Sequence, residues 1–395
     1  MLLDYTQCSM STYTADCSGA ASALYELGGM TVIHDASGCN STYATHDEPR
    51  WSTMPSAVYI SALTEMDAVL GNEEHLVNDI VAAAGELTPA FIAVAGTPIP
   101  MMTGTDLRGI AALIEKRTRI PSFAVASTSM RPYSVGAAQA WIETARRFVM
   151  PAAPGAGTLG INLLGATPLD FSVGPMLGSL RDAAARAGYT INACWAMGDP
   201  LENLTETAAA RVNVVVSASG QPLADYFERH FGMPYVTGLP IGELEPRWRA
   251  AIEWASRNRR SVTLADFLGR EPGGSAVAVL GEPIAAACTA AALNLREPQS
   301  ARALSVLPTL GADAPILTAD LSEDTLRETL RGTKALAADP LFDIIASEAG
   351  LARTVSFPHE ACSGRLYRDR IVNIFESRAL EALFSDLAAC RDDNR

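Results

Sequence analysis

The sequence lacks the features that mark several large protein classes. Its first ten residues contain no basic region followed by a long apolar run, as a secretory signal peptide has. The most apolar segment, at 275–295, does not read as a membrane span because Gly281, Glu282 and Pro283 interrupt it. Lys and Arg number 30 against 44 Asp and Glu and are scattered, which gives a net charge of −14. These absences argue against nucleic-acid and membrane partners and predict a cytoplasmic protein.

Cysteine and nucleotide-binding motifs are also sparse. Seven cysteines in 395 residues do not make a disulfide framework in a reducing compartment, so we expect core residues or metal ligands. The chain has no phosphate loop of the G-x-x-x-x-G-K-[ST] type and is not expected to hydrolyse ATP itself. Gly155, Gly157 and Gly160 spell G-x-G-x-x-G, but a hinge precedes them and a strand pattern follows them. A dinucleotide site needs the reverse order, so NAD is not an expected cofactor.

What the sequence does contain is a repeated alternation of strand-like and helical patterns. Apolar runs at 31–34, 91–95 and 122–125 alternate with amphipathic patterns at 74–84 and 106–116. This alternation is typical of parallel sheets joined by crossover helices. We therefore predict an α/β protein of three Rossmann-like parallel-sheet domains with helices on both faces.

Three domains also suit the length, because 395 residues exceed what one hydrophobic core usually supports. The first is predicted at 1–155 and ends within a hinge rich in Pro, Gly and Ala. The second spans 156–270 and ends in a long connector helix, and the third spans 271–364. The last residues, 365–395, read as a helical tail that we expect to pack back on the first domain.

Two cysteines of the N-terminal region stand beside glycine at the boundaries of predicted elements. Cys17 opens a helical pattern, and Cys39 follows Gly38 after a strand pattern. A helix N-terminus lowers the pKa of a thiol and so favours metal ligation, while a neighbouring glycine lets the backbone approach an inorganic core. The alternative is that both are buried structural residues, because free cysteine is often buried. Local chemistry alone leaves the two interpretations open.

The N-terminal segment resembles that of nitrogenase component 1 subunits and their relatives, which include cofactor-assembly scaffolds and dark-operative protochlorophyllide reductases. The resemblance rests on Cys17, on Leu24-Tyr25-x-x-Gly28-Gly29 and on His34-Asp35-x-x-Gly38-Cys39, and continues at 96–107, 194–199, 212–215 and 226–235. It becomes loose in the C-terminal third. It implies a [4Fe–4S] cluster on the N-terminal domain at a subunit interface, ligated by Cys17 and Cys39.

The departures from the family pattern restrict the cofactor. The family's third cluster cysteine falls at Pro98, and two cysteines per subunit can supply four thiolates if two subunits meet. These subunits can be identical, or one can be a paralogue. Cys8 is an alternative third ligand within one subunit. The family's cofactor-ligating cysteine falls near Ser217, so an iron–molybdenum-type cofactor and dinitrogen reduction are not expected.

Several residues are candidates for acid–base chemistry. His46, Asp47, Glu48 and Arg50 follow Cys39 and would place general acids near a redox centre, where a reduction needs protons with its electrons. The alternative is an ordinary exposed loop. His359 occupies the region of the family's cofactor-binding histidine and is a candidate substrate or metal contact. Its alternative role is that of a polar residue closing a domain interface.

The resemblance therefore implies a catalytic component of a nitrogenase-like two-component reductase. Such a component accepts electrons from a separate ATP-dependent iron–sulfur reductase and passes them to a small-molecule substrate between domains. Two alternatives remain open: a scaffold or carrier for metallocofactor assembly, and a non-redox small-molecule binding module whose cysteines are core residues. The substrate itself is not predicted.

Overall fold

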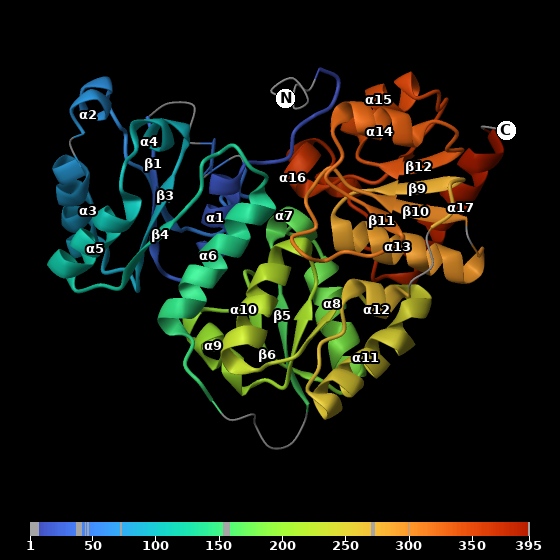
Figure 1. Cartoon of the computed structure of the whole chain (residues 1–395), viewed down its shortest axis with the longest axis horizontal. Helices are drawn as coiled ribbons and strands as arrows, with labels where there is room; N and C mark the ends of the chain where they lie inside the picture. The colour runs from blue at the N-terminus through green and yellow to red at the C-terminus, as the bar shows by residue number, and fades with distance from the viewer. Residues whose placement is uncertain are drawn as a thin grey trace.

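Three parallel sheets organise the chain and confirm the predicted α/β fold class (Figure 1). The computed structural model describes residues 8–36, 42, 43, 45, 47–71, 73–152, 159–269, 273–298 and 300–393. Within these residues every neighbouring strand pair of the three sheets is parallel. In the same ranges no helix is long and apolar enough to cross a membrane.

The first sheet is buried on both faces. Its strand order is β2-β1-β3-β4, with β1 at Met30–His34, β2 at Ala57–Ile60, β3 at Ile92–Gly96 and β4 at Ser122–Val125. Met30 and Val32 belong to the core formed with α3 (Glu73–Leu87) and α5 (Leu107–Thr118). Ile33 belongs to the opposite core, formed with α1 (Asp16–Leu24) and α6 (Tyr133–Phe148). Burial on both faces explains why these strands read as continuous apolar runs.

Helices α1 and α6 cross in unusually close contact at two glycines. A Cβ atom on Gly19 would lie 2.0 Å from the carbonyl oxygen of Tyr133, and one on Gly136 would lie 1.8 Å from that of Asp16. Any side chain at either position would force the two helices apart. The start of α1, which carries Cys17, is therefore fixed against the start of α6.

The second sheet has the order β6-β5-β7-β8. Its strands are β5 at Gly160–Leu164, β6 at Thr190–Trp195, β7 at Val212–Val215 and β8 at Tyr235–Thr237. Its helices are α7 (Pro168–Phe171), α8 (Met176–Arg186), α9 (Leu201–Thr205), α10 (Gln221–Phe231), α11 (Glu245–Asn258) and α12 (Leu264–Leu268). Gly160 is the first residue of β5, so the G-x-G-x-x-G sequence ends where this strand begins and does not follow a strand as a dinucleotide-binding motif would.

The third sheet has the order β11-β10-β9-β12-β13. Its strands are β9 at Val277–Leu280, β10 at Ala301–Leu304, β11 at Leu317–Thr318, β12 at Ala335–Ala338 and β13 at Val355–Ser356. Helices α14 (Glu323–Leu330) and α15 (Asp343–Glu348) share a core with one face, and α13 (Pro283–Arg296) and α17 (Ser377–Asp393) share a core with the other.

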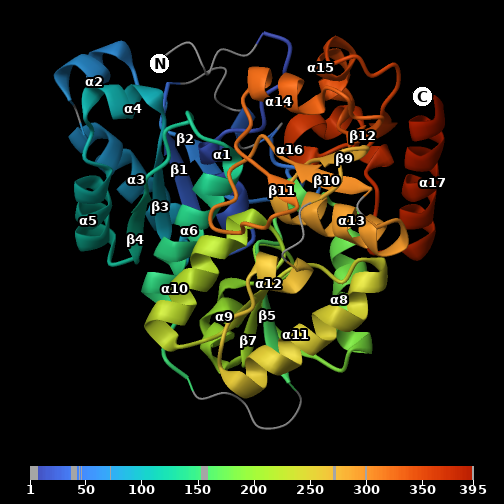
Figure 2. The same cartoon turned by 45° about the vertical axis from the view of Figure 1, so that its right-hand side comes forward.

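The place of the C-terminal helix corrects one expectation. Helix α17 contacts β12 and β13 of the third sheet, and Figure 2 shows it along that side of the molecule, away from the first sheet. Its Leu380, Leu383 and Phe384 are buried there, because the apolar edge of the helix completes the face that α13 leaves open. The chain before α17 does reach the first domain, where the Arg365 guanidinium lies 5.6 Å from the Trp51 ring centre. The domain boundaries themselves remain a prediction.

All three sheets share a topology that creates crevices at their carboxyl ends. The first strand of each lies between the second strand on one side and a later strand on the other: β1 between β2 and β3, β5 between β6 and β7, β9 between β10 and β12. The loops that leave such a pair diverge, and ligands of α/β proteins bind in the gap. The short helices α7 and α16 (Glu360–Ser363) contact each other, and α1 contacts α7, so these ends converge in the middle of the molecule (Figures 1 and 2).

Candidate functional site

The thiol of Cys17 lies buried in the first turn of α1, beside the loop that follows β4. Its Sγ contacts the Ser129 hydroxyl, and the Tyr43 hydroxyl lies 3.3 Å from the same Ser129 oxygen. The Asp16 carboxylate holds this loop by accepting hydrogen bonds from the Thr128 and Ser129 N–H groups. We call Cys17, Ser129 and Tyr43 the cysteine edge, because they lie at the carboxyl edge of the first sheet.

One expectation about this cysteine needs correction. Burial raises the pKa of the Cys17 thiol to about 11, against the lowering effect of the Ser129 hydrogen bond, so the helix N-terminus does not make it acidic. Gly19 serves the close packing of α1 on α6. The donor chemistry nevertheless fits a thiolate ligand, because two hydroxyl groups beside the sulfur can donate hydrogen bonds to it.

The other predicted site residues of this region lie in different places. Gly38, Cys39 and His46 lie outside the described residues. Asp47 accepts a hydrogen bond of 2.8 Å from the Ser18 hydroxyl and so ties its segment to α1. Cys8 is exposed, and its backbone N–H donates to Glu323 of α14, on the third sheet. The structure thus places Cys8 with a different domain from Cys17.

Arg50 and Glu48 form a buried ionic network. The Arg50 Nε lies 2.7 Å from Glu48 Oε1, and a terminal nitrogen lies 2.7 Å from Glu26 Oε1. The remaining donors reach the carbonyl oxygens of Ser22 and Ala196, so the guanidinium joins the first domain to the second. With its nitrogens engaged in this way, Arg50 acts here as a structural tie. A direct catalytic role for Glu48 or Arg50 stays a prediction.

A second polar site lies where the three sheets converge, and sequence reasoning missed its centre, Asp170. Its carboxylate accepts hydrogen bonds from the hydroxyl of Tyr133 at the start of α6 and from Thr167, the latter at 3.0 Å. The Ser219 hydroxyl, in the loop after β7, lies 3.4 Å away. Asp170 therefore sits at the switch point of the second sheet and receives a donor from the first domain. We call Asp170, Tyr133, Glu282 and His359 the junction.

Glu282 faces Asp170 from the switch point of the third sheet. It caps α13, accepting hydrogen bonds from the N–H groups of Ala285 at 2.8 Å and of Ala218 at 2.7 Å. Burial, and then the charge of Asp170, raise the pKa of Glu282 to about 7. Backbone donors oppose this shift but do not cancel it. The junction therefore contains a carboxyl group that can gain or lose a proton near neutral pH.

His359 lies at the junction, where domains meet, and its predicted role as a substrate or metal contact stays a prediction. Its Nδ1 accepts a hydrogen bond from the N–H of Ala361, so Nε2 carries the ring proton. This buried Nε2 lies 3.5 Å from Asp170 Oδ1 but makes no hydrogen bond within the described structure. The Tyr13 ring packs edge-on at 5.2 Å, and burial raises the pKa of the Tyr13 hydroxyl. His359 thus presents an unused donor beside a carboxylate.

The junction encloses a small, mainly apolar cavity, the junction pocket. Its volume is about 40 Å³, room for a few water molecules, and Asp170, Glu282 and His359 line it together with Phe357 and Phe375. Ser217, at the position of the family's cofactor cysteine, donates to the carbonyl of Gly165 instead of facing a ligand. Pro98, at the position of the third cluster cysteine, begins α4 (Pro98–Thr103).

Three of the remaining cysteines are packing residues. Cys194 and Cys288 are buried in the main core. Cys390 is buried as well, with its Sγ 3.2 Å from the carbonyl of Arg353. No group of three or more His, Cys, Asp or Glu side chains within the described ranges is arranged to hold a metal ion.

Comparison with known proteins fixes the family. The nitrogenase component 1 type oxidoreductase family matches residues 16–248. The chain belongs to this family. Membership confirms the resemblance found in the sequence and supports a general oxidoreductase character, and the family implies iron–sulfur cofactors.

Individual curated proteins with similar sequences support this family assignment. One subunit of the light-independent protochlorophyllide reductase of Prosthecochloris aestuarii is 39% identical over 83 residues, 21% of this chain and 16% of the relative. The corresponding subunit from Chlorobium limicola is 26% identical over 231 residues, 56% of this chain and 42% of the relative. The match thus spans less than half the length of these curated relatives.

A solved structure described as nitrogenase Cp1 at pH 5 shares the fold. It superposes with a TM-score of 0.64 at 15% identity, covering 98% of this chain and 89% of that one. At this identity the likeness concerns the fold alone.

Proposed function

We propose that the chain is the catalytic component of a nitrogenase-like two-component reductase. It takes electrons from an ATP-dependent iron–sulfur reductase and reduces a small organic molecule, not dinitrogen, at the junction pocket. The observation that carries this proposal is the junction itself. Groups from all three domains meet there, and burial together with the charge of Asp170 raises the pKa of one of them, Glu282.

The cysteine edge is the proposed electron entry. Cys17 and Cys39, with the same two cysteines of an identical subunit or two from a paralogue, would hold a [4Fe–4S] cluster, which would supply single electrons. Ser129 and Tyr43 would donate hydrogen bonds to the ligating sulfur. Asp16 would keep Ser129 in place through the backbone of its loop.

A short protein path connects this edge with the junction pocket. Ser129 contacts Cys17, and Tyr133, four residues later in the same segment, donates to Asp170. The crossing of α1 and α6 at Gly19 and Gly136 holds both ends of the path rigid. The proposed electron entry and the proposed substrate site would thus be linked through the packed starts of α1 and α6.

The junction is the proposed source of protons. Reduction of one double bond takes two electrons, from the reductase, and two protons, which come in the end from solvent. Protonated Glu282 would donate one, and its pKa near 7 lets it recover a proton at working pH. His359 Nε2–H and the Tyr133 hydroxyl would hold the substrate or keep the Asp170 side chain in place.

Access to the junction pocket would require movement of its cover. Ile371, Val372 and Phe375 line the pocket, and the first two also line an adjoining surface cavity of about 600 Å³. A molecule larger than a few waters would enter by displacing this stretch of chain. The adjoining cavity offers the space from which it would come.

The test is ATP-dependent reduction of the purified chain. Anaerobically prepared full-length protein would be mixed with an iron–sulfur protein of the nitrogenase reductase class, dithionite and ATP, and its cluster followed by EPR. We expect a reduced-cluster signal that appears with ATP and not with ADP. A chain without iron after reconstitution would overturn the proposal in favour of a binding module. Stoichiometric transfer of the cluster to an acceptor protein, without ATP-dependent reduction, would identify a scaffold.

A further inference from the structure

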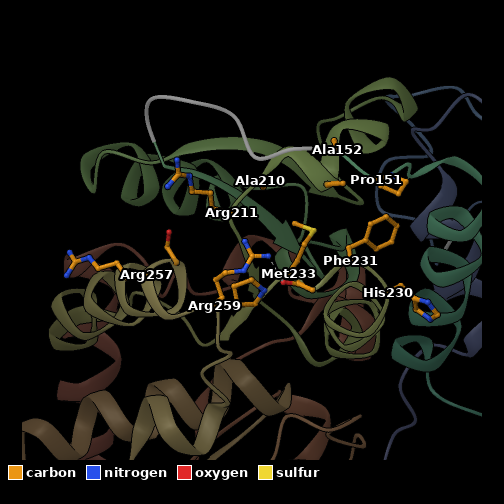
Figure 3. Close-up of a pocket in the computed structure, with 13 residues that line it drawn as sticks. Pro151, Ala152, Ala210, Arg211, His230, Phe231, Met233, Arg257 and Arg259 are labelled. Atoms are coloured by element: carbon orange, nitrogen blue, oxygen red, sulfur yellow. Dashed lines mark hydrogen bonds between the residues drawn. The ribbon is translucent and has the colours of Figure 1, made fainter.

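A second cavity lies at the opposite end of the second sheet from the junction. It has a volume of about 520 Å³ and is formed by residues that precede β5, β7 and β8 and by the C-terminal ends of α10 and α11. Its basic lining consists of Arg211, Arg257, Arg259 and His230, and no Asp or Glu is among the described residues that line it (Figure 3). This is a local reversal of charge in a chain whose net charge is −14. We call it the basic cavity.

Two of the three guanidinium groups have no counter-charge among the residues that the structure describes. Arg257 bonds Glu253 at 2.7 Å, and Figure 3 shows it extending away from the hollow. Neither Arg211 nor Arg259 forms an ion pair with any residue that the structure describes. The Arg259 guanidinium has only the Gly232 carbonyl, at 3.5 Å, and lies beside Met233 (Figure 3). The positive charge of this pair is therefore available to a ligand.

Helix ends account for only part of this charge. The C-terminus of a helix carries a partial negative charge, which a basic residue stabilises. This explains Arg259, the C-cap of α11, in the same way as Arg119 at the end of α5. Arg211 lies in no α-helix and directly precedes β7. The second guanidinium therefore needs another explanation.

We propose that the basic cavity binds a small anion with at least two negative charges, carried by phosphate or carboxylate groups. Arg211 and Arg259 would each face one charged group, since guanidinium forms paired hydrogen bonds with either kind of oxygen anion. Phe231, Met233 and Pro234 would contact an apolar part of the ligand. The volume lies in the ordinary range for small-molecule sites. This site is separate from the proposed reductase chemistry and does not depend on it.

The test is calorimetric titration of the purified full-length chain at low ionic strength with two probes, inorganic pyrophosphate and citrate. We expect binding of at least one, weakened about tenfold or more by Arg211→Gln or by Arg259→Gln and abolished by the double variant. Binding by one probe alone would identify phosphate or carboxylate as the recognised group. Arg108→Gln, an exposed arginine of α5, is the matched control and should bind as the wild type does.

Two results would overturn the proposal. One is wild-type protein that binds neither probe at millimolar concentration. The other is a double variant, folded by circular dichroism, that binds as tightly as the wild type, which would mean that the anions associate with some other surface. Because iron content and ATP-dependent reduction are measured separately, failure here leaves the reductase proposal untouched.

Discussion

The cysteine edge and the junction are built in opposite ways. The cysteine edge draws on short segments around Cys17, Tyr43 and Ser129, and its one described thiol is buried with a raised pKa. The junction collects Tyr133, Asp170, Glu282 and His359 from three domains. The comparison teaches that the cysteine edge is assembled within one domain, whereas the junction forms only where the carboxyl ends of separate sheets meet.

The largest effect on stability is expected at the buried ionic network of Arg50, Glu48 and Glu26. Arg50→Met should lower the free energy of unfolding by about 3–5 kcal/mol, because it leaves Glu48 and Glu26 in a buried site without their counter-charge. Urea denaturation would measure the change. Arg186→Met, which removes an exposed ion pair with Glu245, is the control and should cost less than about 1 kcal/mol. Unchanged stability with lost reduction would instead make Arg50 a functional residue of the cysteine edge.

The next effect concerns the proton of Glu282. The folded protein holds this proton to about pH 7, whereas the unfolded chain releases it near the ordinary value of 4.5. Between these values the folded state binds more protons, so wild-type stability should fall as the pH rises, by about 3 kcal/mol in all. Glu282→Gln stays neutral and should remove this part of the pH dependence. Denaturation at a series of pH values would show it.

Two comparisons make that measurement decisive. Glu202→Gln changes an exposed glutamate of α9 and should keep the wild-type profile. If Glu282→Gln also keeps the wild-type slope, Glu282 does not carry the titrating proton, and the proposed proton supply at the junction is wrong.

A smaller effect is expected from Asp170→Asn. Removing the negative charge of Asp170 should lower the pKa of Glu282 and move the pH-dependent loss of stability to lower pH, while burial continues to hold this pKa above its ordinary value. The side-chain amide also accepts the hydrogen bonds of Tyr133 and Thr167 less well than the carboxylate does. This should lower the free energy of unfolding further, by about 1–2 kcal/mol. The same denaturation series would measure both changes. A profile that does not move would show that the two carboxyl groups do not interact.

The sequence predicted the parts of the fold that are locally determined. Strands buried on both faces, such as β1 and β3, read as apolar runs, and their helices follow the expected period. The two-residue strands β11 and β13 are too short to leave such a signal. The tail helix was assigned to the wrong surface, because its apolar edge shows that it packs but not against which sheet.

The resemblance singled out His359, but the junction as a whole could not be predicted, because a local role accounts for Asp170, for Glu282 and for His359. Asp170 pairs with the N-cap residue Thr167, Glu282 caps α13, and His359 caps α16. A capping residue ordinarily needs no further explanation. The one available signal was position, since Asp170 and Glu282 each follow the first strand of a parallel sheet.

The central claim is that the cluster is held at the cysteine edge and not at the junction. The most direct test is to measure iron and acid-labile sulfide per chain, with EPR, on anaerobically purified protein. Wild type, Cys17→Ser and Asp170→Asn would be compared side by side. We predict about two irons per chain in the wild type, as two chains sharing one four-iron cluster require. Asp170→Asn should keep that iron and its EPR signal, and Cys17→Ser should lose both. Iron retained in Cys17→Ser, or lost from a folded Asp170→Asn, would contradict the account.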